Sequence, residues 1–445
     1  MLRYGPLSRR LVQLSLPILV ENFLVMTLGT VDTLMLSSLS DYSVAAVGMV
    51  NQLVNLVFIV FQVISLGTTI LCSQYFGAKL HDKVIQTVGV SLAFNLLCGL
   101  LLSAILFFFA PQILGLMGLR PELMEDGCQY MRLVGAFAFL QALSLAISAS
   151  LRSAGLTKYP MIVAGVVNLL NIVGDWALIF GHLGMPAMGV RGAALSSVIC
   201  RGISVILLSV FLLRKQIPRF PKRLFTPFPW GEMGRVLKIG VPSAGEQMSY
   251  SLSQVVITYF INLMGNEQLA VRSYVSNIVI FTFMTALSMS QGGSIEIGHL
   301  IGEHRFNAAY RLGRRVGHLS MIITMAIAIG TALAGPLVFG FLSDNDDIIR
   351  LGCAVLWADV LVEYGRAINF FGVNCLRAAG DIYFPVLTGI AVCWTVSVGL
   401  SYLFGIALGG GLTALWIALG LDELTRGCIF LQRWKSRKWA AKAFV

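Results

Sequence analysis

Long apolar runs restrict the fold of this chain more than any other feature. Stretches of roughly 20 residues or more carry few charges and lack the two-residue alternation of a membrane β-strand. Of 445 residues, 57% are hydrophobic and only 12% are charged, so the chain cannot hide its apolar side chains by folding in water alone. The bilayer must act as its solvent. Because backbone groups in hydrocarbon need internal partners, we predict membrane-spanning α-helices.

The runs predict an all-α polytopic membrane protein with twelve transmembrane helices. In the first half we expect spans at residues 11–36, 44–76, 84–109, 127–150, 158–180 and 190–213. In the second half we expect spans at residues 236–262, 268–300, 312–341, 348–375, 383–405 and 411–432.

Basic residues concentrate in every second loop. They occupy the N-terminus (Arg3, Arg9, Arg10), the loops near residues 79–83, 152–158 and 305–315, the segment 214–223 and the tail. The intervening loops, such as 122–126 and 344–347, are acidic. By the positive-inside rule this alternation places both termini in the cytoplasm. It also accounts for the net charge of +11 without a nucleic-acid partner.

The chain repeats itself at a constant offset of 225 residues. Pro17 corresponds to Pro242 and Glu21 to Glu246, and the motif Leu-Arg-x-Ala-Gly recurs at 151–155 and 376–380. Six spans per half give both halves the same orientation, a parallel repeat of the kind used for alternating access. We therefore predict two pseudo-symmetric six-helix bundles. They are an N-lobe (1–213) and a C-lobe (236–432), with a cytoplasmic linker (214–235) and a basic cytoplasmic tail (433–445).

Polar residues within the spans of the N-lobe predict a cation site. Asp32, Asn171, Asp175 and Ser197 lie at similar depth on three spans, and Asn168 extends the stripe that contains Asn171. Their hard oxygen atoms suit Na⁺ or a proton shared by two carboxylates. The alternative is a structural hydrogen-bond network. The repeat partners of the charged and amide residues are Ile257, Val396 and Leu400, so the second half lacks the set.

Other polar residues could relay protons or contact substrate. Glu21 and Glu246 each follow a proline by four residues. The alternative to a relay or substrate role is a structural one, in which each carboxyl group bonds backbone carbonyls or waters freed by the proline kink. Gln52 and Tyr250, on the second and seventh spans, could line a wet cavity or join helices. Pro17 should bend the first span and act as its hinge.

Two charged triplets in the C-lobe suggest pairing within a helix. They are Asp359, Glu363 and Arg366 on the tenth span, and Asp422, Glu423 and Arg426 on the twelfth.

The sequence contains no nucleotide-binding or hydrolase motif of the types GxxxxGK[ST], HExxH or GxSxG. Its eight cysteines form no CxxC pair. We therefore expect no cofactor. Because no ATP-binding motif is present, we expect a gradient of H⁺ or Na⁺ to drive transport.

In order along the chain, several short motifs resemble the multidrug and toxic compound extrusion (MATE) family. They are Leu16-Pro17, Val31-Asp32-Thr33, Ser73-Gln74-Tyr75-Phe76-Gly77-Ala78, Leu151-Arg152-x-Ala154-Gly155, Asn171-x-x-x-Asp175 and Gly192-Ala193-Ala194-Leu195. The resemblance implies a two-lobed fold that exports amphipathic, usually cationic compounds in exchange for Na⁺ or H⁺. It implies that Asp32, Asn171 and Asp175 hold the cation. Ser197 matches a position often held by Thr, and Pro17 matches the proline at which the first span bends.

We therefore expect a secondary active antiporter in the plasma (inner) membrane and not an enzyme. Its partners would be small amphipathic molecules and the bilayer, and the chain would act as a monomer. A flippase of lipid-linked precursors is the alternative, left open by Arg201 and Arg272. A channel or a membrane-embedded enzyme is a further rival, although no catalytic constellation supports the enzyme.

Overall fold

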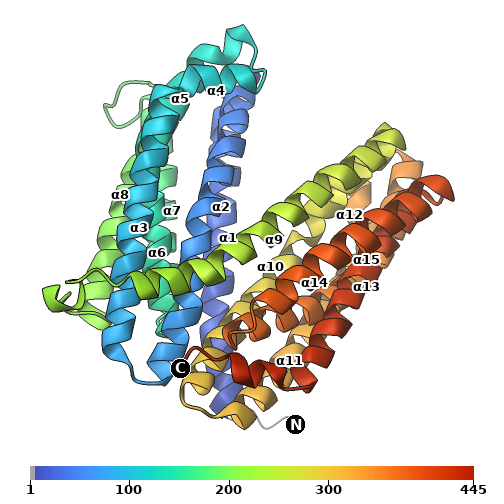
Figure 1. Ribbon diagram of the computed structural model, residues 1–445. Helices are drawn as coiled ribbons and strands as arrows, with labels where there is room; N and C mark the ends of the chain where they lie inside the picture. The colour runs from blue at the N-terminus through green and yellow to red at the C-terminus, as the bar shows by residue number, and fades with distance from the viewer. Residues whose placement is uncertain (1–5) are drawn as a thin grey trace. The chain divides into compact units, whose positions relative to one another are not determined.

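The computed structural model describes residues 6–445, so Arg3 lies outside the described residues. The described chain is helical almost throughout (Figure 1). The helices of its first half are α1 (Pro6–Ser37), α2 (Asp41–Gly77), α3 (His81–Phe108), α4 (Ala110–Leu116), α5 (Met124–Ala136), α6 (Ala138–Ser153), α7 (Lys158–Phe180) and α8 (Val190–Lys215). α5 and α6 are bent by 44° at a one-residue break and together form one broken span.

The second half has the same order of long helices. They are α9 (Trp230–Leu263), α10 (Asn266–Gly302), α11 (Phe306–Leu333), the short α12 (Gly335–Leu342), α13 (Asp346–Ala378), α14 (Tyr383–Val392) and α15 (Gly411–Lys435). α14 continues as two π-helical stretches, Cys393–Val398 and Ser401–Ala407, which complete the span predicted at 383–405.

The helices are long enough to give the expected number of spans. Within residues 6–445, eight are both long and apolar enough to cross a bilayer, and the α5–α6 pair makes a ninth. The more polar helices α9, α13 and α15 have 34, 33 and 25 residues, and each exceeds a hydrocarbon thickness of about 30 Å at about 1.5 Å per residue. These twelve elements confirm the all-α, polytopic architecture.

The described chain packs as two compact units. The N-terminal unit is Val20–Val241, and the C-terminal unit is Pro242–Val445 together with residues 6–19. α1 and α9 each contribute to both units, and each changes unit within three residues of a proline, Pro17 or Pro242. The predicted lobes, 1–213 and 236–432, follow from the sequence repeat. The compact units differ from them because the first part of α1 packs with the C-terminal half and the first part of α9 packs with the N-terminal half.

Glycines allow the N-terminal parts of α1 and α9 to dock closely. In the N-terminal unit, a Cβ atom on Gly67 of α2 would lie 2.5 Å from the carbonyl oxygen of Val236 on α9. In the C-terminal unit, a Cβ atom on Gly292 of α10 would lie 2.2 Å from the Ser15 hydroxyl on α1. Gly67 and Gly292 are repeat partners, so equivalent helix pairs pack closely in both units, although Ser15 corresponds to Gly240 and not to Val236.

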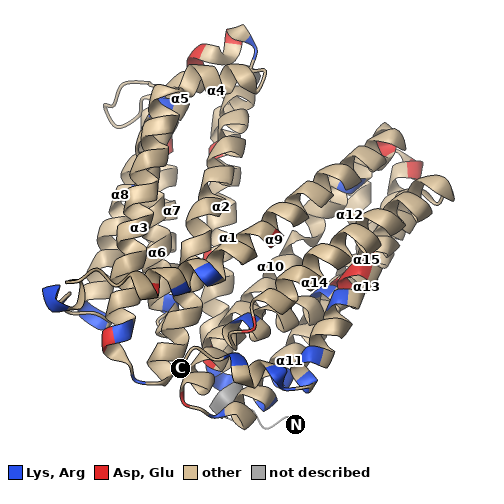
Figure 2. Cartoon of the chain, viewed as in Figure 1, with Lys and Arg blue, Asp and Glu red and all other residues tan. Residues whose placement is uncertain are grey.

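Ion pairs fix the same two segments. The Tyr75 hydroxyl donates a hydrogen bond of 2.8 Å to the buried Glu232 carboxylate of α9, and Arg235 approaches that carboxylate to 3.0 Å. In the C-terminal unit, Arg10 of α1 approaches the Glu296 carboxylate of α10 to 2.8 Å. Arg10 and Arg235 are again repeat partners. Most Lys and Arg residues lie toward one end of each bundle (Figure 2).

The C-terminal tail is folded onto its unit. After α15, a 3₁₀-helix (Lys438–Lys442) carries Trp439, which is 1% exposed and stacks on Trp434 with ring centroids 4.3 Å apart. The segment predicted as a basic tail therefore contributes an aromatic side chain to the core. On the N-terminal side, α8 ends at Lys215 and α9 begins at Trp230, so both helices extend into the predicted linker.

Candidate cation site

The predicted stripe on α7 faces the interior of the N-terminal unit. Asn168, Asn171 and Asp175 are all buried, with Asp175 fully so. Asp32 of α1 is half-buried and interacts directly with Asp175. Each carboxylate lies five residues before the end of its helix, or about 7 Å along the axis. The structure therefore brings Asp32, Asn171 and Asp175 together at one depth.

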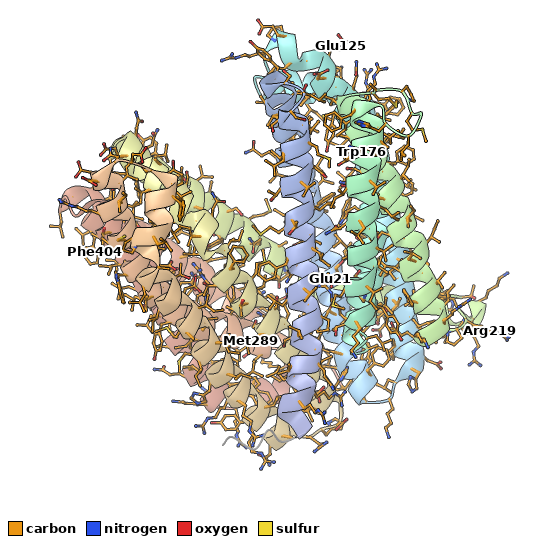
Figure 3. All side chains as sticks on the ribbon, turned by 180° about the vertical axis from the view of Figure 1, so that it is seen from behind. Glu21, Glu125, Trp176, Arg219, Met289 and Phe404 are labelled. Atoms are coloured by element: carbon orange, nitrogen blue, oxygen red, sulfur yellow. The ribbon has the colours of Figure 1, made fainter. Side chains whose placement is uncertain are left out.

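The cluster can be placed along the length of the N-terminal unit by the labelled residues near it. Figure 3 shows Glu125 at one end of the N-terminal unit and Arg219 at the other, with Trp176 toward the Glu125 end. Trp176 is the residue next to Asp175. The cluster thus lies nearer the acidic end of the unit than the basic end.

Four buried oxygen atoms of this cluster have no hydrogen-bond donor among the described residues. They are both carboxylate oxygens of Asp175, one of Asp32 and the amide oxygen of Asn171. An unpaired buried carboxylate is costly, because desolvation is not offset by any partner. A proton shared by the two carboxylates, or a Na⁺ ion bound by these oxygens, would remove that cost. The donor set therefore fits either coupling ion.

The hydroxyl group of Ser196 contacts this cluster. The Asn171 amide donates a hydrogen bond of 3.2 Å to the Ser196 hydroxyl, which in turn lies 3.4 Å from the Asn171 carbonyl oxygen. Ser197, the residue predicted from sequence, is one position further along α8 and points about 100° away around the helix. The two serines are adjacent in sequence, and only the packing of α7 against α8 distinguishes them.

Glycines allow α7 and α8 to approach closely enough for this contact. A Cβ atom on Gly174 would lie 2.6 Å from the Ser196 hydroxyl, and one on Gly192 would lie 2.4 Å from the Leu178 carbonyl oxygen. Asn168 performs a different task, because its amide donates a hydrogen bond of 2.5 Å to the Leu24 carbonyl of α1. This bond joins α1 to α7 about two helical turns before Asp175 along α7.

The two predicted relay glutamates lie in equivalent ion pairs. Glu21 accepts a hydrogen bond of 2.5 Å from Arg152, and Glu246 accepts one from Arg377. Both arginines belong to the repeated Leu-Arg-x-Ala-Gly motif, so each unit has its own copy of the pair. These contacts give both glutamates a structural role in fastening α1 to α6 and α9 to α13.

Gln52 and Tyr250 lie apart from the N-terminal cluster. Gln52 is exposed on α2. Tyr250, on α9 of the C-terminal unit, is half-buried and lies near the charges of Glu423, Arg366 and Arg426. Gln52 and Tyr250, the predicted substrate contacts, thus belong to different units.

The two charged triplets of the C-terminal unit form one network. Pairing within each helix is confirmed, since Arg366 bonds Glu363 and Arg426 bonds Asp422. The helices are also joined, because the Asn369 amide donates a hydrogen bond of 2.6 Å to Glu423. A further predicted member, Asp359, accepts a hydrogen bond of 2.9 Å from the indole of Trp416. This network couples α13 to α15.

Residues 6–445 contain no group of three or more His, Cys, Asp or Glu side chains arranged to hold a metal ion. The N-terminal cluster has only two carboxylates, which suits a monovalent cation better than a transition metal.

A bundle of membrane-crossing helices around buried, unpartnered carboxylates defines a polytopic membrane transporter. The chain belongs to the MatE family, whose model matches residues 17–177 and 242–409. The two matched segments begin at Pro17 and Pro242, 225 residues apart, and so reproduce the internal repeat. Membership of this family makes the chain a transporter and not an enzyme.

Known relatives cover nearly the whole chain. The uncharacterized transporter YisQ of Bacillus subtilis strain 168 is 39% identical over 436 residues, which cover 98% of this chain and 96% of YisQ. The probable multidrug resistance protein NorM of Thermotoga maritima is 28% identical over 444 residues, which cover 99% and 94% of the two chains. A crystal structure of MATE in the bent conformation has a TM-score of 0.89 at 19% identity, covering 98% and 96%. The fold is therefore the MATE fold.

Proposed function

We propose that this transporter exports amphipathic organic cations in exchange for H⁺ or Na⁺. The observation that carries the proposal is the set of unpartnered buried oxygens on Asp32, Asn171 and Asp175. A site that needs a positive charge can receive it from the coupling ion or from a cationic substrate. If each ligand favours a different conformation, binding of one promotes release of the other.

The family relatives support this reading of the substrate. The 28% identical NorM of Thermotoga maritima is named a probable multidrug resistance protein, and the 24% identical PmpM of Pseudomonas aeruginosa is named a multidrug resistance protein. The 39% identical YisQ is named only as a transporter. The structure adds the local reason for cationic cargo, which is the excess of carboxylate oxygens over donors.

Alternating access requires a place where the chain can bend. We propose Pro17 as a hinge, with Pro242 as its counterpart, since α1 and α9 pass between the compact units beside these prolines. A proline removes one backbone hydrogen bond and lets a helix bend there. We further propose that both termini are cytoplasmic in the plasma (inner) membrane, as the charge alternation indicates, and that the chain acts as a monomer.

Transport by purified protein in liposomes tests the proposal. A fluorescent organic cation is loaded, and its flux is measured under separately imposed Na⁺ and pH gradients. Wild-type protein should exchange the dye against one of the two gradients. Asp32→Asn should lower that flux to the level of empty liposomes, because the exchangeable negative charge is lost. Asp344→Asn, a change in an exposed loop, is the matched control and should retain flux.

Full gradient-driven flux in the Asp32→Asn protein would refute the proposed site. Rapid scrambling of a labelled lipid by wild-type protein, with no dye flux, would instead identify a lipid flippase.

A further inference from the structure

Arg201 is a membrane-embedded cation without an ion-pair partner. It lies on α8 of the N-terminal unit, 11 residues after the first residue of the helix and five residues beyond Ser196. Among residues 6–445 it forms no salt bridge, and its buried Nη1 atom has no hydrogen-bond partner. Its guanidinium lies over the Phe58 ring, 5.3 Å from the centroid. An unpaired arginine at this depth is expensive and indicates a functional role.

The repeat shows which partner Arg201 lacks. Its counterpart 225 residues later is Arg426, which bonds Asp422 one helical turn earlier and lies 3.6 Å from Glu423. The residue equivalent to Asp422 in the first half is Ser197. The N-terminal unit therefore has a hydroxyl group where the C-terminal unit has the carboxylate that pairs with its arginine.

The free charge of Arg201 acts on the cation site. Arg201 and Asp32 interact electrostatically, and Arg201 lies on the same helix as Ser196, whose hydroxyl contacts Asn171. Two carboxylates, Asp32 and Asp175, and one guanidinium leave the cluster with a single net negative charge when all three are ionised. One proton or one Na⁺ ion then makes the cluster neutral.

We propose that Arg201 sets the charge of the substrate, so that the site accepts one positive charge and discriminates against dications. This inference rests on the proposed function and names the substrate class of the same site. A first positive charge is attracted by the net charge of the cluster. A second positive charge meets a neutral cluster and is repelled by the nearby guanidinium. Specificity of this kind comes from a repulsive element as well as an attractive one.

Ethidium and propidium provide a matched pair of probes. They share one ring system, but ethidium carries one permanent positive charge and propidium carries two. Binding of each dye to purified protein in detergent is measured by fluorescence anisotropy, without any gradient. Two variants cancel the positive charge of Arg201: Arg201→Gln removes the cation, and Ser197→Asp supplies a carboxylate partner one helical turn earlier, as Asp422 does for Arg426.

In both variants we expect the affinity for propidium relative to ethidium to rise about tenfold, equivalent to about 1.4 kcal/mol. Arg201→Lys keeps the charge and should keep the wild-type ratio. Arg272→Gln is the matched control, because it removes another membrane-embedded arginine, one that donates to Thr258 in the C-terminal unit. Its ratio should also stay within about twofold of wild type.

An unchanged ratio in a folded Arg201→Gln or Ser197→Asp protein would overturn the inference, and either variant alone is sufficient for the test. In that case the proposed function would still stand if wild-type protein binds the dyes and the Asp32→Asn protein does not. Failure of wild-type protein to bind either dye would overturn both.

Discussion

The contact between α7 and α8 at Gly192 gives a quantitative prediction about the geometry of the site. A Cβ atom on Gly192 would lie 2.4 Å from the Leu178 carbonyl oxygen and 2.9 Å from the Ile179 amide nitrogen. Ordinary van der Waals contact needs about 3.5 Å, so Gly192→Ala must push the two helices apart by about 1 Å. Backbone atoms cannot rotate out of the way as a side chain can. The substitution therefore acts on the helix spacing itself.

The expected energy follows from two opposing effects. Overpacking of a helix interface costs about 1–3 kcal/mol, and replacing glycine by alanine in a helix returns up to about 1 kcal/mol. We expect Gly192→Ala to destabilise the protein by about 1–2 kcal/mol. Gly202 lies on the same helix, and no atom of the described residues lies within 4 Å of the position that its Cβ atom would occupy. Gly202→Ala should therefore stabilise the protein by about 0.5–1 kcal/mol.

Thermal unfolding in detergent at one fixed scan rate checks the order of the three proteins. The midpoint should fall for Gly192→Ala and stay or rise for Gly202→Ala. Because Ser196 lies one turn after Gly192, the first variant should also lengthen the hydrogen bond of 3.2 Å between Asn171 and Ser196 and weaken dye binding. A Gly192→Ala midpoint at or above that of wild type would refute this reasoning.

Two further predictions concern the C-terminal unit. Glu246→Gln leaves Arg377 buried without its carboxylate, so it should cost about 3 kcal/mol of stability, whereas Glu303→Gln, which breaks an exposed pair, should cost less than about 1 kcal/mol. Equal midpoints for these two variants in the same unfolding assay would contradict the structural role of the repeated pair. Trp439→Ala should cost about 3–5 kcal/mol because its ring is 1% exposed, and Trp230→Ala, at 70% exposed, should cost about 0.5 kcal/mol or less. A Trp439→Ala protein as stable as wild type would show that the tail is not part of the core.

The spans were predictable because hydropathy and charge alternation act along the chain and need no knowledge of packing. The same reasoning could not place Trp439, since a tryptophan in a basic tail has no periodic neighbours to reveal its burial. It could not show that α5 and α6 form a broken span either. Hydropathy predicts the start of α9 six residues late, at 236 instead of Trp230, because the first turns carry Glu232 and Arg235, which are charged side chains stabilised by tertiary contacts.

The site was predictable to the level of helix faces but not of individual contacts. Spacing of three and four residues grouped Asn168, Asn171 and Asp175 on one helix face, and the structure buries all three. It could not decide between Ser196 and Ser197, because one residue of helix phase changes the direction of a side chain by about 100°. The ion pairs of Glu21 and Glu246 were missed for another reason. Each pair joins residues 131 positions apart, although the repeat of both members was a signal that could have revealed them.

The repeat also separates scaffold from chemistry. Polar contacts present in both halves, such as Glu21–Arg152 and Glu246–Arg377, satisfy needs that both bundles share. A polar group found in only one half has no such explanation, but it can still be structural if it is paired, as in the α13–α15 network. The buried oxygens of Asp32 and Asp175 that lack a hydrogen-bond donor have no counterpart in the second half, where Ile257 and Leu400 stand at the equivalent positions. A buried group that lacks both a symmetric counterpart and a hydrogen-bond donor in the chain fits a role in binding an external cation, which is the role proposed above for this site.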